Sequence, residues 1–305
     1  MTLQQIFYVI TISDCGSMNK AAESLYISQP TLTSAVKELE SELGITIFKR
    51  TGRGTYLTVE GEEFLIYARQ MYQQYELIRE KYSDFSNIKR KFGVSSQHYS
   101  FAVKAFVETV KRFDMKKYEF AMREEKTADV IGDVSTLKSE IGILYINDFN
   151  SKIINKMLRD NDLEFHPLID CKAYVYIWKN HPLAKNKSIT FAELEKYPCL
   201  SFEQGDKGSF YFAEEILSTN EYPRIIKATD RSTMLNLMVG LNGYTLCSGI
   251  ICEELNGSDF LAVPYKSDED NPNQTMQIGY ICKKNVPVST IGDIYIKELK
   301  KYLNK

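Results

Sequence analysis

The first 44 residues carry apolar side chains at helical spacing, broken by the residue types that start and end helices. Leu3, Ile6, Phe7 and Ile10 follow the i, i+3, i+4, i+7 pattern of an amphipathic helix, and Gly16 breaks it. Ser17 is a favourable N-cap for a second helix, and Ser28-Gln29-Pro30 opens a third. Gly44 ends the third helix. Its predicted buried stripe is Leu32, Ala35, Val36, Leu39 and Leu43.

A hairpin is predicted after the three helices. Residues 45–48 and 55–57 have the composition of two short strands, and Gly52-Arg53-Gly54 supplies the turn. Residues 1–58 therefore form one predicted domain of three helices and a hairpin.

A long helix is predicted next, over residues 59–91. Its apolar side chains alternate steps of four and three, which predicts packing along a partner helix; the alternative is a helix lying on its own domain. The basic run at residues 89–91 marks its polar end and a linker. The apolar positions are Phe64, Ala68, Met71, Tyr75, Ile78, Tyr82 and Phe85.

From Phe92 onward, apolar strands alternate with helices, which predicts an α/β fold with a parallel sheet. A first group has strands at 92–95, 118–123 and 141–146 with helices at 99–113 and 128–137. A second has strands near 173–178, 199–202, 225–228 and 244–248 with helices near 191–196, 209–218 and 232–240. The last strand (276–282) and helix (290–303) can pack onto either group.

Composition is that of an ordinary globular protein, with 44% hydrophobic and 26% charged residues in 305. There is no apolar run of membrane-spanning length and no secretory signal, so we expect a cytoplasmic location. Net charge is −2, and the first sixty residues hold five cations against six anions. If the first sixty residues bind nucleic acid, they must do so through the local placement of their cations, because they carry no net positive charge.

Neither a metal nor a cofactor is expected. The six cysteines form no Cys-x-x-Cys pair, and His98, His166 and His181 show no spacing typical of metal ligands. We expect free thiols, as in a reducing compartment. No second cysteine follows Cys199 closely, so a redox-active cysteine pair is not expected there.

The second and third helices form a helix-turn-helix pattern, whose polar outer face lies in the major groove when such a unit binds DNA. The alternative is a solvated face. Lys49, Arg50 and Arg53 in the hairpin can reach the DNA backbone. The predicted DNA-binding positions on the third helix are Ser28, Gln29, Pro30, Thr31, Thr33, Ser34 and Lys37.

Residues 17–65 closely resemble the winged helix-turn-helix of the LysR-type bacterial transcriptional regulators. The matching positions include Ala21-Ala22, Ile27-Ser28-Gln29-Pro30, Leu39-Glu40, Leu43-Gly44 and Leu57-Thr58 with Gly61. Ser34 and Ala35 stand where many members have arginine. This helix is therefore expected to depend more on hydroxyl contacts and DNA shape.

Weaker matches continue at 140–143, 180–183 and 238–244. The resemblance implies a winged helix-turn-helix at 1–58, a dimerising linker helix at 59–91, and an effector domain at 92–305 of two α/β subdomains resembling periplasmic binding proteins. Subdomain I would span about 92–165 and 270–305, and subdomain II about 166–269. It also implies promoter DNA as partner and a homotetramer, although the heptad pattern by itself supports only a dimer.

Ligands of open α/β sheets bind beyond the carboxyl ends of strands, near helix N-termini. Helix capping is the alternative role of each such residue. Thr127 stands where the family often has a ligand-facing threonine. The candidate effector-binding residues are Ser95, Ser96, Gln97, His98, Thr127, Phe202, Gln204, Thr229 and Asp230.

The function we expect is that of a LysR-type regulator controlled by a small molecule bound between the two subdomains. Lys207 and Arg231 near hydroxyl- and amide-rich loops favour a polar or anionic metabolite. A solute-binding protein is disfavoured by the N-terminal motif. An enzyme is disfavoured because the chain has no nucleophile elbow, phosphate loop or paired acid–base residues.

Overall fold

The structure of the chain is a computed structural model that describes residues 1–51, 54–82, 90–113, 118–205, 210–267 and 275–303. For residues 50, 77 and 80–82 only the backbone is described. The chain divides into two units, Met1–Ser86 and Asn87–Lys305, which are considered separately below.

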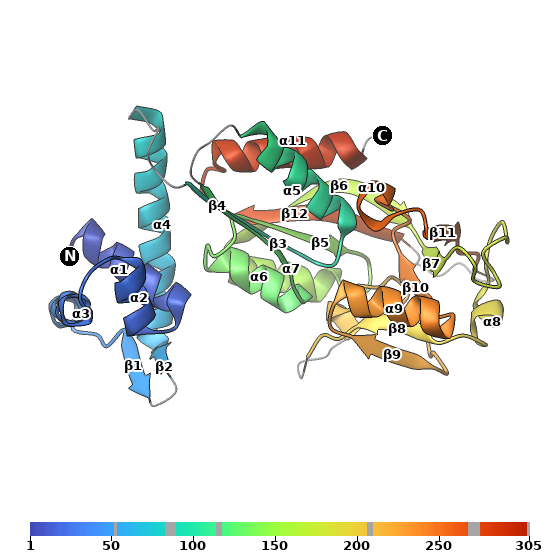
Figure 1. Ribbon diagram of the computed structural model, residues 1–305, viewed down its shortest axis with the longest axis horizontal. Coiled ribbons are helices and arrows are strands. Elements are labelled where there is room, and N and C mark those ends of the chain that lie inside the picture. The colour runs from blue at the N-terminus through green and yellow to red at the C-terminus, as the bar shows by residue number, and fades with distance from the viewer. Residues whose placement is uncertain (52–53, 83–89, 114–117, 206–209, 268–274, 304–305) are drawn as a thin grey trace. The chain divides into compact units, whose positions relative to one another are not determined.

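The three predicted N-terminal helices are present: α1 (Leu3–Cys15), α2 (Met18–Ser24) and α3 (Gln29–Leu43) (Figure 1). Ser28 caps α3 by accepting from the Thr31 amide at 3.2 Å. Gly44 ends α3 with a φ of 70°, a left-handed conformation that glycine adopts without strain. Leu32, Val36 and Leu39 are buried on one side of α3, so its opposite side is left for solvent or a partner.

A two-stranded antiparallel hairpin follows, formed by β1 (Phe48–Thr51) and β2 (Gly54–Leu57). The Thr58 hydroxyl then accepts from the Gly61 amide at 2.9 Å at the start of α4 (Val59–Tyr82). The predicted turn residues Gly52 and Arg53 lie outside the described residues.

The apolar side chains of α4 divide between two environments. Leu65 and Ala68 are buried in the first unit, and Tyr72 stacks on Phe7 of α1 at 5.2 Å. Met71 and Ile78, in contrast, are 44% and 60% exposed. The helix thus packs partly on its own unit and leaves part of the heptad uncovered. The Tyr82 side chain and Phe85 are outside the described residues.

The second unit contains a five-stranded sheet in the order β4-β3-β5-β12-β6. The predicted parallel pairing holds for β3 with β4 and β5, but β12 is antiparallel to both β5 and β6. The strands are β3 (Arg90–Ser96), β4 (Tyr118–Glu124), β5 (Ile141–Ile146), β6 (Leu163–Lys172) and β12 (Thr275–Lys283). The last strand therefore lies in the first sheet.

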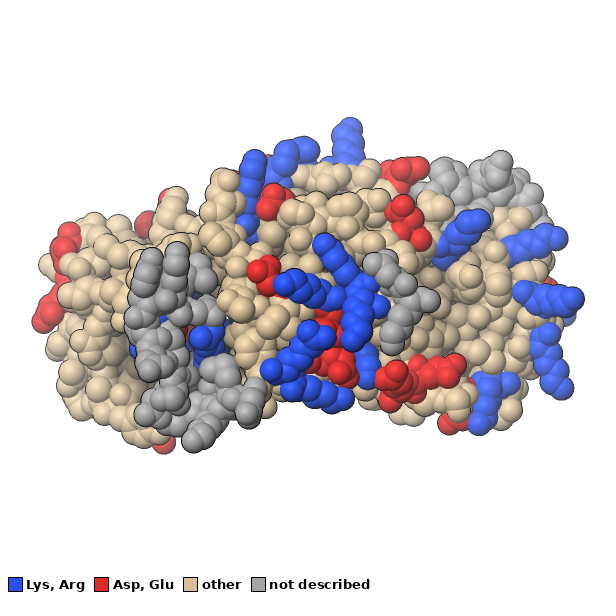
Figure 2. All heavy atoms as spheres, turned by 90° about the horizontal axis from the view of Figure 1, so that it is seen from above, with Lys and Arg blue, Asp and Glu red and all other residues tan. Residues whose placement is uncertain are grey.

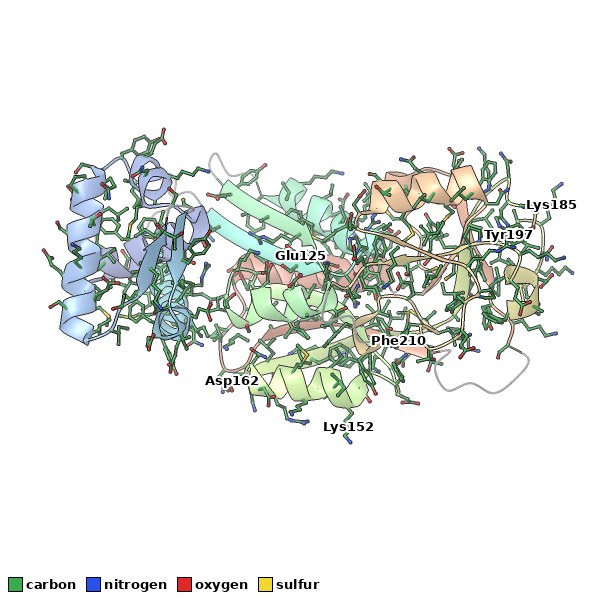
Figure 3. The ribbon with its side chains drawn as sticks, turned by 90° about the horizontal axis from the view of Figure 1, so that it is seen from below. Glu125, Lys152, Asp162, Lys185, Tyr197 and Phe210 are labelled. Carbon is green, nitrogen blue, oxygen red and sulfur yellow. The ribbon has the colours of Figure 1, made fainter. Side chains whose placement is uncertain are left out.

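Helices cover both faces of this sheet (Figure 1). On one face α5 (Ser100–Arg112) packs beside α11 (Thr290–Leu303), and Tyr295 contacts Phe92 ring to edge. On the other lie α6 (Thr127–Ser135) and α7 (Ser151–Asp160). Lys152 on α7 is exposed, and Asp162 takes a φ of 52° in the turn into β6 (Figure 3). This sheet and its helices are subdomain I.

Residues 173–264 form subdomain II, which the chain enters after β6 and leaves before β12. Its sheets have the orders β10-β7-β11 and β8-β9, and a bridge between Cys199 and Tyr244 joins β8 to the start of β10. Because β6 extends to Lys172, the crossing lies at residue 173, later than the expected 165. The elements are β7 (Tyr174–Trp178), α8 (Phe191–Leu194), β8 (Cys199–Phe202), β9 (Ile225–Ala228), α9 (Arg231–Leu241), β10 (Thr245–Cys247), α10 (Glu253–Asn256) and β11 (Phe260–Pro264).

The prediction of a helix at 209–218 is wrong for the part of that segment that the structure describes. A short 3-10 turn, η1 (Phe210–Phe212), is followed by irregular backbone, and Leu217 has a φ of 61°. Glu214 and Glu215, which resemble the solvent face of a helix in the sequence, are both 7% exposed. Their carboxylates accept the backbone amide hydrogens of His98 and Phe202, so both side chains are buried by bonds to other segments of the chain.

Candidate functional site

The N-terminal half of α3 presents polar side chains opposite its buried stripe. Pro30, Thr31, Ser34 and Lys37 are exposed. Gln29 is half-buried and donates to the Thr33 hydroxyl at 2.8 Å. The Ser28 hydroxyl lies 2.7 Å from that of Thr31. Hydroxyl and amide groups of this kind can exchange such local bonds for base edges and phosphates.

Two further groups belong to this surface. Lys49 is exposed on β1; the Arg50 side chain and Arg53, predicted beside it, lie outside what the structure describes. Tyr26, in the turn between α2 and α3, is 96% exposed with a φ of 55°. Tyr26 is not among the predicted DNA-binding residues. On the face of the larger unit that Figure 2 shows, Lys and Arg side chains lie in groups, with Asp and Glu side chains beside them.

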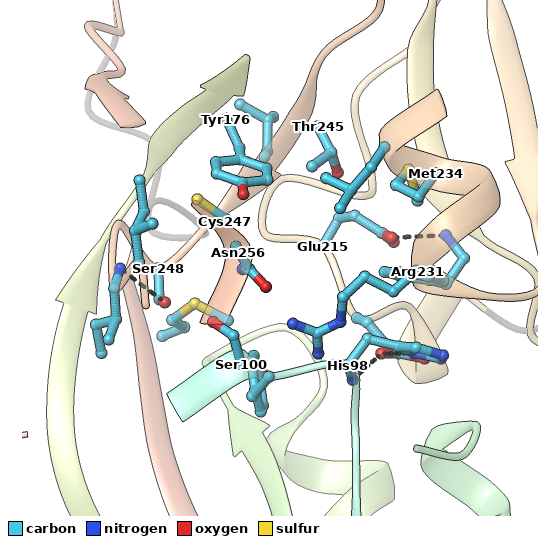
Figure 4. Close-up of a pocket in the computed structure, with 18 residues that line it drawn as sticks. His98, Ser100, Tyr176, Glu215, Arg231, Met234, Thr245, Cys247, Ser248 and Asn256 are labelled. Carbon is cyan, nitrogen blue, oxygen red and sulfur yellow. Dashed lines mark hydrogen bonds and ion pairs between the residues drawn. The ribbon is translucent and has the colours of Figure 1, made fainter. Parts of the chain in front are cut away.

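A pocket of about 100 Å³ lies between the two subdomains (Figure 4). Subdomain I contributes His98, Tyr99 and Ser100 beyond the end of β3, and Met276 from β12. Subdomain II supplies an apolar wall and several polar groups. Its lining residues are Tyr176, Phe202, Glu214, Glu215, Arg231, Met234, Leu235, Thr245, Leu246, Cys247, Ser248, Ile250, Ile251 and Asn256.

Two buried carboxyl groups stand at this pocket. Glu214 accepts from the backbone amide and Nδ1 of His98, each at 2.8 Å, and the His98 ring stacks on Phe202 at 3.8 Å. Glu215 accepts from the Phe202 amide at 2.7 Å. Burial, and secondly the neighbouring Glu214, raise the pKa of Glu215 to about 8, so this carboxyl is mostly protonated at pH 7.

Arg231 extends from the first turn of α9 into the pocket (Figure 4). Its guanidinium pairs with Glu124 at the end of β4, and this ion pair joins subdomain II to subdomain I. Across the pocket the Tyr176 hydroxyl is buried and has no partner in hydrogen-bond geometry among the described residues. Burial raises its pKa to about 12, although Arg231 and Asn256 act in the opposite direction. A cation and an unsatisfied hydroxyl thus meet in one small space.

Of the nine predicted effector residues, His98 and Phe202 line the pocket. Gln97, Thr127 and Gln204 instead form a hydrogen-bonded chain that joins the subdomains. Gln97 Nε2 donates to the Thr127 hydroxyl at 2.6 Å, which donates to the Phe212 carbonyl at 2.7 Å. Gln204 accepts from the Thr127 amide at 3.2 Å and donates to Glu214 at 2.8 Å.

The other four predicted residues have local partners or lie at the surface. Ser95 is buried and donates to Asp133 at 2.6 Å, and Ser96 donates to the Gln97 carbonyl at 2.6 Å. Asp230 caps α9 by accepting from the Thr233 amide at 2.9 Å, which is the capping alternative considered above. Thr229 is exposed.

Sequence reasoning missed the buried acid pair and the pocket wall. Glu214 and Glu215 precede Ile216 and Leu217, a pattern that helical periodicity assigns to a solvent face. Tyr176 lies in a strand that alternation identifies as core. Arg231 was identified only as a nearby charge. Lys207, the second cation expected there, lies outside the described residues.

The cysteines are free in this structure. Cys199 is 4% exposed in β8, and burial raises the pKa of its thiol, which opposes thiolate formation. Burial likewise raises the pKa of Cys171 to about 11 and that of Cys247 to about 12.

A helix-turn-helix with a hairpin wing, joined to a two-subdomain module with a pocket between its lobes, defines a ligand-responsive DNA-binding protein. Comparison with protein families gives the same result. Residues 3–62 match the bacterial regulatory helix-turn-helix of the LysR family, and residues 100–289 match the LysR substrate binding domain. The chain therefore belongs to the LysR family of DNA-binding transcriptional regulators, and it is not an enzyme.

Curated relatives are also regulators. The RuBisCO operon transcriptional regulator of Allochromatium vinosum is 26% identical over 205 residues, 67% of this chain and 65% of its own length. AlsR of Bacillus subtilis is 28% identical over 252 residues, 80% of each chain. The dual regulator OxyR of Escherichia coli is 22% identical over 303 residues, 97% of this chain and 89% of its own.

Solved structures share the fold. A full-length OxyR from Pseudomonas aeruginosa superposes with a TM-score of 0.69 at 20% identity, covering 100% of this chain and 95% of that one. CbnR, a LysR family transcriptional regulator, gives a TM-score of 0.57 at 16% identity, covering 99% of this chain and 99% of that one. In the described part of this chain, no helix is both long and apolar enough to span a membrane.

Proposed function

We propose that the N-terminal half of α3 contacts base edges in the major groove of promoter DNA. The observation that carries this proposal is the division of α3 into a buried side and an exposed polar side at its N-terminal end. Thr31, Ser34 and Lys37 are the central contacts. They offer hydroxyl groups and one cation where an arginine–guanine pair is common in the family.

Phosphate contacts would position this helix. Lys49 on β1 is exposed, and Arg50 and Arg53 belong to the same hairpin in the sequence. We add Tyr26, because its hydroxyl group stands in the turn before α3 with almost no protein cover. Such contacts set orientation without carrying sequence information.

The experiment for this face compares two substitutions of the same kind on one helix. Ser34→Glu places a negative charge in the proposed contact region, and Ser41→Glu places it two turns further along. We expect Ser34→Glu to weaken binding to the chain's own upstream DNA by about 5- to 150-fold, the range for one good base contact. Ser41→Glu should keep most of the affinity. Equal losses in both variants would contradict the proposal.

We further propose that the pocket binds a small carboxylate with a short apolar body. Its carboxyl group would meet Arg231 and the Tyr176 hydroxyl, and its apolar part Met234, Leu246 and Ile250. A cavity of about 100 Å³ is smaller than the roughly 150 Å³ that holds benzene, which limits the ligand to a few heavy atoms. Glu215, largely neutral at pH 7, adds a hydrogen-bond donor instead of a repelling charge.

Binding of such a ligand would redistribute the two lobes. Arg231 pairs with Glu124 across the subdomains, so a ligand carboxylate at Arg231 competes with that pair. The ligand then favours the lobe arrangement in which its own contacts are strongest, which is a population shift. This arrangement would be transmitted to the spacing of DNA-binding heads in the oligomer.

The test of the pocket is a thermal-shift and calorimetric series with short-chain carboxylates and their matched amides. We expect the carboxylates, but not the matched amides, to raise the unfolding temperature of the full chain, and we expect Arg231→Met to abolish this stabilisation. The matched control is Arg224→Met, because Arg224 is exposed and its guanidinium donates to the Lys196 carbonyl, away from the pocket. Equal stabilisation by amides, or unchanged carboxylate binding in Arg231→Met, would refute the proposed ligand class.

We also propose a dimer formed along α4 and, from the family resemblance, a cytoplasmic homotetramer of two such dimers. Tyr67, Met71 and Ile78 leave 63%, 44% and 60% of their surface exposed on one helix. Such a surface is typical of an interface rather than a solvated face. Sedimentation of Met71→Glu should show a smaller species than the unsubstituted chain, and an unchanged assembly would contradict the α4 interface.

A further inference from the structure

Three metal-ligating side chains of different type meet on subdomain I, outside the pocket. Glu164 and His166 are two residues apart on β6, so they lie on the same face of the sheet. The antiparallel register places Cys282 of β12 opposite Glu164, and Tyr280 opposite His166. The group Glu164, His166 and Cys282 thus comes from two neighbouring strands, and Glu164 and Cys282 are 118 positions apart in the chain.

The distances in this group are near those of a metal site. The imidazole Nε2 of His166 lies 3.2 Å from the Glu164 carboxylate, and the Cys282 sulfur lies 3.8 Å from the same carboxylate. All three ligand atoms lie within 4.8 Å of one another. Tetrahedral Zn²⁺ bonds of about 2.0–2.3 Å put ligand atoms roughly 3.3–3.8 Å apart. Rotamer adjustments of under about 1 Å would therefore bring all three onto one ion.

The donor types select among cations. A thiolate, an imidazole and a carboxylate suit Zn²⁺ and similar transition metals, whereas Mg²⁺ and Ca²⁺ prefer oxygen ligands. The thiolate and carboxylate together balance a divalent charge. Glu164 and His166 side chains are 45% and 38% exposed, which gives access to an entering ion and to a water as fourth ligand.

The arrangement is more than a cross-strand contact. His166 stacks on Tyr280 at 4.6 Å between centroids, and this contact holds the imidazole with Nε2 toward Glu164. Cys282 is 4% exposed, yet its sulfur points to a carboxylate rather than only to apolar neighbours.

We propose that Glu164, His166 and Cys282 form a binding site for Zn²⁺ or a similar divalent transition metal. The site ties β6 to β12, the two strands through which the chain enters and leaves subdomain II. The site lies near the end of the β6–β12 ladder where Leu163 pairs with Lys283. The chain passes to subdomain II at the opposite end of the ladder, where Lys172 pairs with Thr275. Bound metal therefore stabilises the edge of subdomain I independently of the effector pocket.

The experiment uses the full chain without an affinity tag, titrated with Co²⁺ and then with Zn²⁺ in competition with a chromophoric chelator. We expect one ion per chain and a thiolate-to-cobalt charge-transfer band with the visible bands of a tetrahedral centre. Cys282→Ser should remove the charge-transfer band. It should also weaken Zn²⁺ binding at least about 100-fold, because even second-shell changes cost 10- to 100-fold.

Two controls keep the result interpretable. His166→Gln changes a half-exposed residue, so it tests the site even if Cys282→Ser impairs folding, and it should also lose Zn²⁺ affinity. Cys15→Ser and His181→Gln, which lie elsewhere, should bind as the unsubstituted chain does. A cobalt spectrum without the charge-transfer band, or Zn²⁺ affinity unchanged in both site variants, overturns the proposal.

Discussion

The buried carboxyl of Glu215 makes the stability of the effector unit depend on pH. Its pKa lies at about 8 in the folded chain against an ordinary 4.5, so the folded state holds a proton that the unfolded state releases between these values. The protonated Glu215 carboxyl therefore contributes fully to the free energy of unfolding below pH 4.5, and this contribution is lost as pH rises to about 8. At about 1.4 kcal/mol per pKa unit, the free energy of unfolding falls by about 5 kcal/mol over this range.

Glu215→Gln should remove this dependence. Glutamine keeps the oxygen that accepts from the Phe202 amide at 2.7 Å and has no charge to bury. Relative to the unsubstituted chain, the free energy of unfolding should be nearly unchanged at pH 4.5 and higher by about 5 kcal/mol at pH 8, with no further gain above.

Urea unfolding followed by fluorescence of Trp178 measures this change, because that residue is the only tryptophan and lies in the effector unit. Glu203→Gln, an exposed neighbour, is the control and should show no pH-dependent gain. A constant difference between Glu215→Gln and the unsubstituted chain across this pH range would refute the reasoning.

Three further predictions concern the core and the thiols. Gly61→Ala would place a Cβ 2.1 Å from the Ile47 carbonyl oxygen, so calorimetry should show that the free energy of unfolding falls by at least about 3 kcal/mol. In the control Gly132→Ala the added Cβ meets open space in α6, so this substitution should be neutral or stabilising. Leu39→Ala empties a fully buried site in α3 and should cost about 2–5 kcal/mol in chemical denaturation; a loss under about 1 kcal/mol would contradict its place in the core. Peroxide should leave Cys199 reduced in the native chain, as thiol alkylation and mass spectrometry can test, because its thiol is buried with a raised pKa; rapid oxidation there would contradict this.

Local signals predicted the first unit well. Ser17, Ser28 and Pro30 start helices, and Gly16 and Gly44 end them, as their conformational preferences imply. These effects act over a few residues, so the sequence alone contains them.

The pocket depends on interactions between distant segments. Glu214 and Glu215 look solvent-facing in the sequence and are buried because His98 and Phe202 present amides to them from other elements. The strand β6 was missed because Pro167 and the adjacent apolar pair Leu168-Ile169 interrupt the alternation of apolar and polar residues that begins at Leu163. The antiparallel placement of β12 likewise follows from packing rather than from any local pattern.

The ion pair between Arg231 and Glu124 gives the most direct test of a regulator whose pocket controls its DNA contacts. The measurement is the affinity and footprint on upstream DNA of the unsubstituted full chain, Glu124→Gln, and the adjacent control Glu125→Gln. The account predicts salt-sensitive binding by the unsubstituted chain and by the control. Glu124→Gln should show an altered footprint or an affinity changed by about 5- to 150-fold, the usual range of allosteric coupling. Identical affinities and footprints for all three chains, or no DNA binding at low salt, would contradict it.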